Sequence, residues 1–393
     1  MHTRSLLITL LLVAPIAPSA TIAQDSKHNT LTKEELSNGW ILLFDGESLY
    51  GWQPASKADW KVTGGVISVG SGEKGLLCTT SEFSDYILKV DFRAPATTNS
   101  GVFLHTAPVP KDPAKDCYEL NIAAPAKSPF FTGSFVGRAK ASTEKFDEEW
   151  HSYEVTASGP HWTVKLDGRQ VLDYSDPSPL GRGPIGLQFN EGKVEFRNVK
   201  LKTLNLKSIF NGKDLAGWHT VEPNKSDFSV TGKGELNVKN GRGSLESAGS
   251  YGDFALQLEC FSNGKHLNSG IFFRSIPGQM NNGYECQIRN EYKDGDRNQP
   301  VDFGTGGIYR RQPARRVTAD DFTWFPMTLV VTGNHMAAWV NGIQVSDFTD
   351  TRKPNANPRE GLRTEPGTLQ IQGHDPTTDL SFRKLQIAEI PKR

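Results

Sequence analysis

Two short segments in the second half of the chain carry side chains suited to acid–base and hydrogen-bond chemistry. The segment Tyr-Glu-Cys-Gln-Ile-Arg contains Glu285 and Gln287, and the segment Ser-Gly-Ile-Phe-Phe-Arg contains Phe272 and Arg274. Successive side chains of a β-strand point to opposite faces, so Glu285 and Gln287 share one face, as Phe272 and Arg274 do on theirs. A carboxylate, an amide, a guanidinium and an aromatic ring on one surface suit a polyhydroxylated ligand.

The elements that would position these residues are β-strands. Short alternating runs such as 86–92 and 254–261 are bounded by Gly, Pro, Asn and Ser, and helix signals are nearly absent. The pairs Asp167-Gly168 and Asn341-Gly342 lie between alternating runs, where such a pair predicts the turn of a β-hairpin. The pattern predicts an all-β fold of the jelly-roll β-sandwich type.

The chain contains two copies of one unit. The segment Phe-Asp-Gly-Glu-Ser-Leu-Tyr-Gly-Trp ending at Trp52 returns as Phe-Asn-Gly-Lys-Asp-Leu-Ala-Gly-Trp ending at Trp218, and other segments return in the same order. The unit is too long for a solenoid repeat, so each copy should be a complete domain. We expect a first domain at 38–204 and a second at 205–393, joined by a connection too short to be a flexible tether.

The N-terminus has the features of a secretory signal peptide. Arg4 precedes an apolar run, and small residues follow it. We expect a signal peptide at 1–23, a linker at 24–37 and a secreted or periplasmic protein. The run is shorter than the roughly 20 apolar residues of a spanning helix, so we expect no stable membrane insertion. Lys+Arg and Asp+Glu are both 44, which favours no nucleic-acid partner.

The cysteines and acidic loops give little sign of a disulfide framework or a cofactor. Cys78, Cys117, Cys260 and Cys286 do not correspond between the two copies, which favours buried thiols. The loop 294–298 resembles the start of a calcium loop but lacks the glycine and the bidentate glutamate that an EF-hand requires. We therefore expect no cofactor, with a divalent metal such as calcium as the alternative.

The repeated segments resemble the 3-keto-disaccharide hydrolase family, whose domains have a concanavalin A-like jelly-roll fold. The second copy matches nearly the whole pattern, including Gly-Thr-Gly-Gly-Ile-Tyr-Arg-Arg ending at Arg311 and Gln-Gly-His-Asp ending at Asp375. The first copy has drifted, with His105 in place of the arginine and Asn121 in place of the glutamine. The resemblance implies two tandem jelly-roll domains, the second closer to the family pattern.

The resemblance also implies a saccharide partner and cleavage of glycosides oxidised to a ketone at C3. Such a ketone acidifies the C2 proton, so a base can remove it and the C1 substituent can leave. We take Glu285 as the base, Arg274 or Arg310 as the oxyanion partner and His374 as the acid, with Asp375 orienting His374 or binding a metal. These roles are interchangeable among the residues named. The candidate substrate-binding residues are Gln287, Phe272, Tyr309, Arg310, Gln372 and, in the first copy, Glu119 and His105.

Other interpretations remain open. The same fold serves non-catalytic, lectin-like carbohydrate-binding proteins. An ordinary glycosidase would need two carboxylic acids across the bond, whereas Glu285 is followed on its strand face by an amide. The arginines at 310, 311, 315 and 316 are typical of a solvated loop, or of a site for an acidic or carbonyl-bearing sugar.

Overall fold

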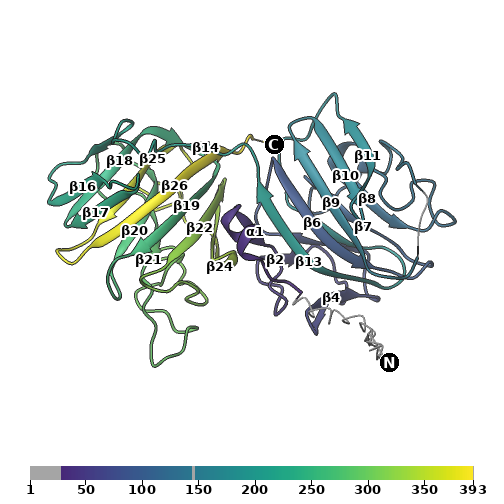
Figure 1. The fold of residues 1–393 in the computed structure, drawn as a ribbon. Coiled ribbons are helices and arrows are strands. Elements are labelled where there is room, and N and C mark those ends of the chain that lie inside the picture. The colour runs from purple at the N-terminus through teal and green to yellow at the C-terminus, as the bar shows by residue number, and fades with distance from the viewer. Residues whose placement is uncertain (1–27, 144–146, 393) are drawn as a thin grey trace, which may run out of the picture.

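The computed structural model describes residues 28–143 and 147–392, which form two β-sandwiches lying side by side (Figure 1). The predicted signal peptide lies outside the described residues. The elements of the first sandwich are α1 (Lys33–Ser37), β1 (Trp40–Leu42), β2 (Trp52–Pro54), β3 (Lys61–Thr63), β4 (Val66–Val69), β5 (Gly75–Thr79), β6 (Tyr86–Arg93), β7 (Asn99–Leu104), α2 (Pro113–Asp116), β8 (Tyr118–Ala123), β9 (His151–Ser158), β10 (His161–Leu166), β11 (Arg169–Ser175), β12 (Gly186–Phe189) and β13 (Val194–Thr203). Those of the second are β14 (Lys207–Ser208), β15 (Trp218–Thr220), β16 (Ser226–Val230), β17 (Leu236–Asn240), β18 (Gly243–Tyr251), β19 (Phe254–Ser262), β20 (Ser269–Ser275), β21 (Tyr284–Ile288), β22 (Trp324–Thr332), β23 (His335–Val340), β24 (Ile343–Thr349), β25 (Gly367–Gly373) and β26 (Asp379–Glu389).

The two sandwiches have the same strand order. The larger sheets run β11-β10-β9-β6-β13-β4-β3 and β24-β23-β22-β19-β26-β17-β16, with β1 and β14 added on β13 and β26. The smaller sheets run β2-β5-β12-β7-β8 and β15-β18-β25-β20-β21. Each strand of one domain has the same place in its sheet as a strand of the other domain. The duplication seen in the sequence is therefore also a duplication of strand topology. The prediction of two tandem all-β jelly-roll domains is confirmed.

The alternating runs and the turn residues explain why these strands form where they do. In β6 the residues Tyr86, Leu88 and Val90 are fully buried in the first core, and the residues between them are partly exposed. The hairpin turns contain Asp167 and Asn341 at φ 50° and 52°, each followed by glycine with positive φ. This is the two-residue turn whose twist suits antiparallel strands. All four cysteines are free and buried, as expected.

Part of the larger sheet of the second domain, at β22 and β23, is buried on both faces. In β22, Met327, Leu329 and Val331 pack in the second domain's core, whereas Val330 belongs to the first domain's apolar cluster. Trp339 of β23 is also part of the first cluster; it is 1% exposed, and its Nε1 donates to the carbonyl of Leu42 at 2.9 Å. By contrast, β9 alternates buried with partly exposed residues. The first domain therefore covers the outer face of the second at β22 and β23.

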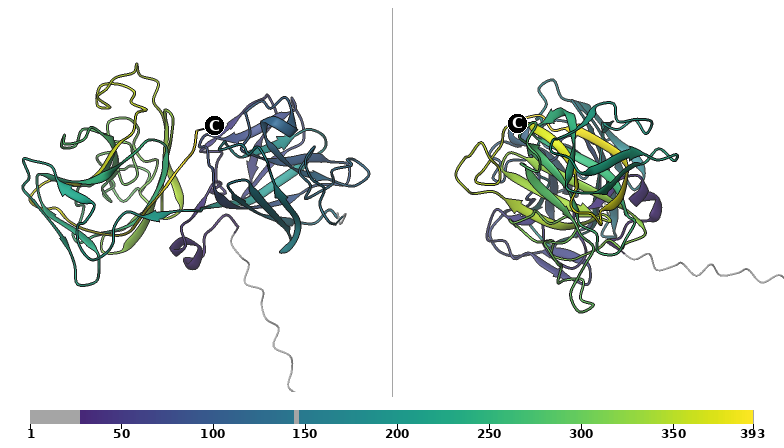
Figure 2. Two further views of the ribbon diagram at one scale, coloured as in Figure 1. Left: turned by 90° about the horizontal axis from the view of Figure 1, so that it is seen from above. Right: turned by 90° about the vertical axis from the view of Figure 1, so that its left-hand side faces the viewer.

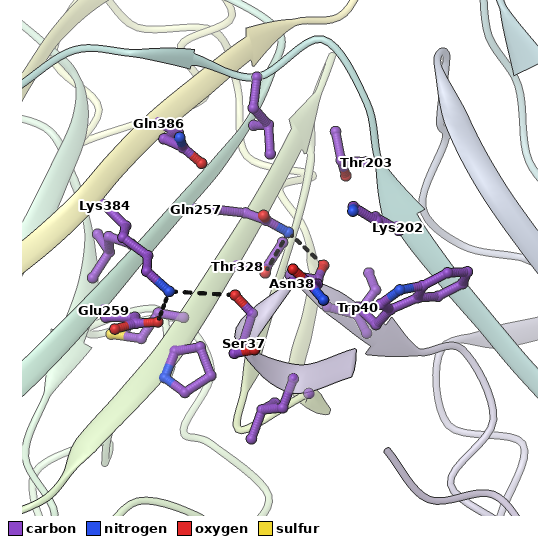
Figure 3. A pocket seen from close by; sticks show the side chains of 18 of the residues that line it. Ser37, Asn38, Trp40, Lys202, Thr203, Gln257, Glu259, Thr328, Lys384 and Gln386 are labelled. Atoms are coloured by element: carbon purple, nitrogen blue, oxygen red, sulfur yellow. Dashed lines mark hydrogen bonds and ion pairs between the residues drawn. The ribbon is translucent and has the colours of Figure 1, made fainter. Parts of the chain in front are cut away.

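Polar contacts reinforce this junction, where α1 lies between the two sandwiches (Figures 1 and 2). A groove of about 470 Å³ runs along it (Figure 3). Lys384 Nζ donates to Glu259 Oε1 at 2.7 Å and to the carbonyl of Ser37 at 3.3 Å. Gln257 Nε2 donates to the carbonyl of Gly39 at 2.9 Å. These groups form hydrogen bonds with one another across the two domains, so the groove is part of the domain interface.

Neither helix in the described part of the chain has the length and apolar character needed to cross a membrane. Both are single short turns, and α1 begins at a capping box. Thr32 Oγ1 accepts from the Glu35 amide, and Glu35 Oε2 accepts from the Thr32 amide, both at 3.0 Å.

Candidate active site

A pocket of about 640 Å³ opens on the smaller sheet of the second domain. Its floor comes from β21 and β25, and its walls come from the loops that follow β17, β20, β21 and β24. The lining residues are Arg242, Asn268, Met280, Asn281, Glu285, Gln287, Asp302, Tyr309, Arg310, Arg311, Arg359, Gln372 and His374. Six of these, Glu285, Gln287, Tyr309, Arg310, Gln372 and His374, are residues that the sequence singled out.

Glu285 lies at the floor of this pocket. It is 4% exposed, and its Oε2 accepts a hydrogen bond from Arg359 Nη2 at 3.1 Å. Burial raises the pKa of the Glu285 carboxyl above its usual value, although the charges of Arg359 and His374 act in the opposite direction. The neighbouring strand makes room for this side chain through Gly270, where a Cβ would lie 2.8 Å from Glu285 Oε1. The result is a carboxyl that holds its proton more tightly than an exposed one.

The glycine-rich segment that follows β21 brings Tyr309 and Arg310 beside Glu285. Its backbone pairs with β21, which is the edge strand of the smaller sheet: the Tyr309 amide donates to the carbonyl of Glu285 at 2.9 Å. Gly306 has φ 86°, and a Cβ there would lie 2.4 Å from Val345 Cγ2. Only glycine therefore fits this tight turn, which explains the glycines of the motif.

Arg359 was not anticipated from the sequence, yet it holds the pocket together. Its Nε and Nη2 donate to the carbonyl of Asn281 at 3.1 and 3.0 Å, and its guanidinium lies 4.9 Å from the centre of the Phe272 ring. It comes from the long connection between β24 and β25, which carries no strand periodicity to mark its side chains. The length of that connection was the available signal, because long loops in compact domains are commonly functional.

Two amides on the pocket floor offer free acceptors. Gln287 Nε2 donates to the carbonyl and to Oδ2 of Asp302, both at 3.0 Å, and to Asn268 Oδ1 at 3.3 Å. These three acceptors fix which end of the amide is nitrogen. The Oε1 atoms of Gln287 and of Gln372 are buried and have no hydrogen-bond partner within the described residues. Both amides can therefore accept a hydrogen bond from a ligand.

His374 immediately follows β25 and lines the pocket. Its Nδ1 lies 2.8 Å from Asp375 Oδ2, so Asp375 orients the ring. The other carboxylate oxygen of Asp375 accepts from the amide and the hydroxyl of Thr377 at 2.8 and 2.6 Å, which lowers the Asp375 pKa together with His374 despite partial burial. No cluster of three or more His, Cys, Asp or Glu residues suited to a metal occurs in residues 28–143 and 147–392. The geometry is that of a carboxylate that orients His374.

Arg274 does not reach the pocket, contrary to the alternation argument. A β-bulge adds a residue between Phe272 and Ser275, and Arg274 has φ 47°. Its side chain is completely buried and donates to the carbonyls of Gly252 and Gly333 at 3.0 and 2.6 Å and to Asp253 Oδ1 at 2.7 Å. The bulge turns Arg274 away from the face that carries Phe272, so Arg274 stabilises loops and does not contact the ligand.

His105 occupies the corresponding position of the first domain and also has a positive φ, of 46°. It is 2% exposed, and its two ring nitrogens lie 2.8 Å from the carbonyl oxygens of Leu180 and Ser84. It therefore has the same structural role as Arg274 and is not available to a substrate. Phe272 lies on the expected face, but it is fully buried under Arg359, so it supports the pocket from below.

The first domain has its own, smaller pocket of about 360 Å³ at the corresponding place. Glu119 lies in it and is 7% exposed. Burial raises the pKa of the Glu119 carboxyl to about 7, and a hydrogen bond from Gln188 opposes this shift. Strand register makes Asn190 the counterpart of His374 and Gln188 that of Gln372. The first pocket therefore retains the carboxyl and loses the imidazole.

The raised pKa of Glu119 predicts a pH-dependent stability. Between about pH 4.5 and pH 7 the unfolded chain releases this proton while the folded chain keeps it, so stability falls as pH rises through this range. The full difference corresponds to a loss of up to about 3 kcal/mol. Urea unfolding at pH 5 and pH 8 should show a smaller pH-dependent loss for Glu119→Gln than for the unaltered protein. Identical losses would mean that Glu119 ionises normally.

A tandem jelly-roll β-sandwich with a polar pocket on a smaller sheet defines a class of fold shared by enzymes and lectins. Within that class, residues 39–202 and 205–388 each match the family described as the 3-keto-alpha-glucoside-1,2-lyase-like domain. The two matches cover most of the chain, so the protein belongs to this family, as the sequence resemblance predicted. By that membership it is a carbohydrate-active protein.

Solved structures are similar to this chain at low identity. A protein from Parabacteroides distasonis ATCC 8503 described as a glycosyl hydrolase is 24% identical, with 46% of this chain and 100% of that chain covered and a TM-score of 0.41. The carbohydrate-binding module CBM66 from Bacillus subtilis is 20% identical, with 39% and 96% covered and a TM-score of 0.32. The comparison with curated proteins found no match.

Proposed function

We propose that the second domain cleaves glycosides that carry a ketone at C3, by elimination across C1 and C2, and that it does so outside the cytoplasm. The observation that carries the proposal is the buried Glu285 carboxyl, which shares one pocket with His374 and Arg359. The family description, which names a 1,2-lyase, supports the same bond change. The signal-like N-terminal sequence supports export.

The reaction follows from the ketone. Glu285 accepts the C2 proton, and the electron pair of that C–H bond moves toward C3 and leaves an oxyanion there. The oxyanion then collapses to form the C1–C2 double bond, and the C1–O bond breaks. His374 gives a proton to the departing oxygen, and water adds afterwards. A base whose pKa lies nearer to neutrality than that of an exposed glutamate suits the first step.

Of the two arginines that the sequence offered for the oxyanion role, Arg310 keeps it, and Arg359 joins it in place of Arg274. Both line the pocket, and Arg359 already lies within hydrogen-bond distance of Glu285. A guanidinium in this position stabilises negative charge that develops on the C3 oxygen. Such a donor contributes about 3–4 kcal/mol to the transition state.

The two-carboxylate mechanism requires a second carboxylic acid beside Glu285. Asp302, which also lines the pocket, is the candidate. Asp302 Oδ2 accepts from Asn268 Nδ2 at 2.9 Å and from Gln287 Nε2 at 3.0 Å. A carboxylate that accepts two such bonds is held as an acceptor and is poorly suited to donate a proton. We therefore favour the elimination mechanism.

The test is a panel of disaccharides offered to the mature protein in native and 3-keto form, in deuterated solvent. We expect a released monosaccharide and deuterium at C2 only with the 3-keto forms. Cleavage of native disaccharides without exchange at C2 would instead support the two-carboxylate mechanism. Binding of the sugars without any cleavage would identify a lectin and overturn the proposal.

A further inference from the structure

We propose that the substrate of the second-domain pocket carries an anionic group, a carboxylate or a sulfate ester, beside its sugar hydroxyls. The inference takes its site from the proposed function, but it concerns recognition and does not depend on cleavage. The observation behind it is an excess of arginine. Four arginines line the pocket with two acidic residues, so the pocket carries two more positive than negative charges when His374 is neutral.

Two of these arginines have no acidic partner. The side chains of Arg242 and Arg310 are exposed, and in the described part of the chain neither forms an ion pair. Arg311 donates only to the backbone carbonyls of Arg310 and Arg359, at 3.1 and 2.7 Å. Within residues 28–143 and 147–392, Arg359 is the one of the four that forms an ion pair with a carboxylate, that of Glu285. Three guanidinium groups are therefore available to a bound anion.

The other two arginines of the run, Arg315 and Arg316, have a different role from Arg310 and Arg311. Arg315 Nη2 pairs with Asp45 Oδ2 at 2.7 Å, and Arg316 pairs with Glu47, both across the domain junction. These two arginines have acidic partners, as arginines with a structural role usually do. The neighbouring Arg310 and Arg311 face the pocket without such partners, and a guanidinium fork matches the geometry of carboxylate and sulfate oxygens.

Like charges crowded in one pocket repel one another unless an anion is bound. Burial lowers the pKa of Arg311, and the charges of Arg352 and Arg359 act in the same direction, while Asp350 and Tyr284 oppose them. Arg352 lies outside the pocket lining and is paired with Asp350 at 2.7 Å, so Arg359 is the repelling charge within the pocket. An anion among these side chains would relieve that repulsion. Such an arrangement is typical of a site prepared for negative charge.

The first domain shows what this pocket looks like without the charge excess. Strand register and loop pairing make Lys74 the counterpart of Arg242, Gly137 that of Arg310, and Arg138 that of Arg311. Arg138 is neutralised by Asp176, at 2.7 Å. The charged residues of the first pocket are two lysines and two glutamates, which balance. Excess positive charge is therefore specific to the second pocket.

The floor of the pocket shows that the ligand is a sugar and not a bare anion. The unpartnered Oε1 atoms of Gln287 and Gln372 need a hydrogen-bond donor, and sulfate or carboxylate oxygens cannot supply one. Sugar hydroxyls can. A floor of acceptors under a rim of guanidinium groups fits an acidic sugar that presents hydroxyls to the sheet and its anionic group to the loops.

Calorimetry on the mature, full-length protein tests the inference with three matched probes. They are methyl glucoside, methyl glucuronide and methyl glucoside 6-sulfate, each as both anomers, with inorganic sulfate as a fourth ligand. We expect at least one charged sugar to bind about tenfold or more tightly than methyl glucoside. That preference should shrink at high salt, and the better of the two charged sugars identifies the group.

Substitution of a pocket arginine tests whether that side chain causes the preference for a charged sugar. Arg242→Gln should reduce the preference for the charged sugar several-fold and leave the affinity for methyl glucoside nearly unchanged. Arg169→Gln removes an exposed arginine from a hairpin of the first domain and serves as the matched control, which should change neither value.

Three results would overturn the inference. These are equal affinity for charged and neutral sugars, no binding by any of the three sugars, and inorganic sulfate binding as tightly as the sulfated sugar. The cleavage assay separates this inference from the proposed function. A charged sugar that binds in the expected way with no cleavage of any 3-keto-glycoside leaves the inference intact and overturns the function. Efficient cleavage with no charge preference does the reverse.

Discussion

Glu285→Gln should reduce turnover of a 3-keto-glycoside by about 10²-fold or more and change its binding by little. The substitution keeps the size of the side chain and its carbonyl acceptor for Arg359, which lies 3.1 Å from the carboxylate. It removes the atom that accepts the C2 proton. Steady-state kinetics and calorimetry on the same preparation measure the two effects, and exchange of the C2 proton with deuterated solvent should fall in parallel with turnover.

The duplicated chain supplies the matched control. Glu119→Gln makes the same change at the corresponding place in the first domain, where the counterpart of His374 is Asn190, and it should leave most of the activity intact. An equal loss in both variants would show that the first pocket is also catalytic. Normal turnover by Glu285→Gln would exclude Glu285 as the base and direct attention to Asp302 or Asp375.

Trp339→Ala should lower the free energy of unfolding by about 3–5 kcal/mol. The indole is 1% exposed, lies 6.5 Å from the ring of Phe83 between centroids, and donates to the carbonyl of Leu42. Truncation would leave a cavity between the two domains and an unsatisfied carbonyl. Urea unfolding monitored by circular dichroism measures the change.

Trp324→Ala is the comparison for that experiment. Trp324 begins the neighbouring strand β22 and is only partly buried. The guanidinium carbon of Arg383, also in the second domain, lies 4.0 Å from the centre of the Trp324 ring. Its loss should cost clearly less. If Trp339→Ala cost under about 1 kcal/mol, the junction would be a loose contact, and the apolar residues on it would need another explanation.

The fold could be read from the sequence because its signals are local and occur twice. The hairpin at Asp167 and the hairpin at Asn341 have the same turn chemistry, and the strand that carries Glu285 alternates regularly. Alternation also placed Gln287 correctly on the face of Glu285. These are short-range properties, and each copy repeats the evidence of the other.

The errors arose where the chain departs from regular geometry. A bulge reverses the direction of Arg274, and alternation cannot detect one extra residue. Arg359 comes from an aperiodic loop and meets Glu285 across 74 positions of sequence. The domain junction did leave a signal: β22 and β23 contain consecutive apolar residues, Leu329 to Val331 in one and Met336 to Val340 in the other, as strands covered on both faces do.

The covered sheet of the second domain has a consequence for how the protein is made. Synthesis proceeds from the N-terminus, so the first domain leaves the ribosome before β22 and β23 exist. Its own β9 keeps partly exposed polar side chains such as Glu154 and Thr156 on the outer face. The second domain, by contrast, emerges with an apolar outer face that includes Val330 and Trp339, and it finds the complementary surface already assembled beside it. The order of the two domains in the chain thus lets the first domain fold before the second one needs it. In a chain with its two halves exchanged, the apolar outer face would be exposed to aggregation before the domain that covers it was translated.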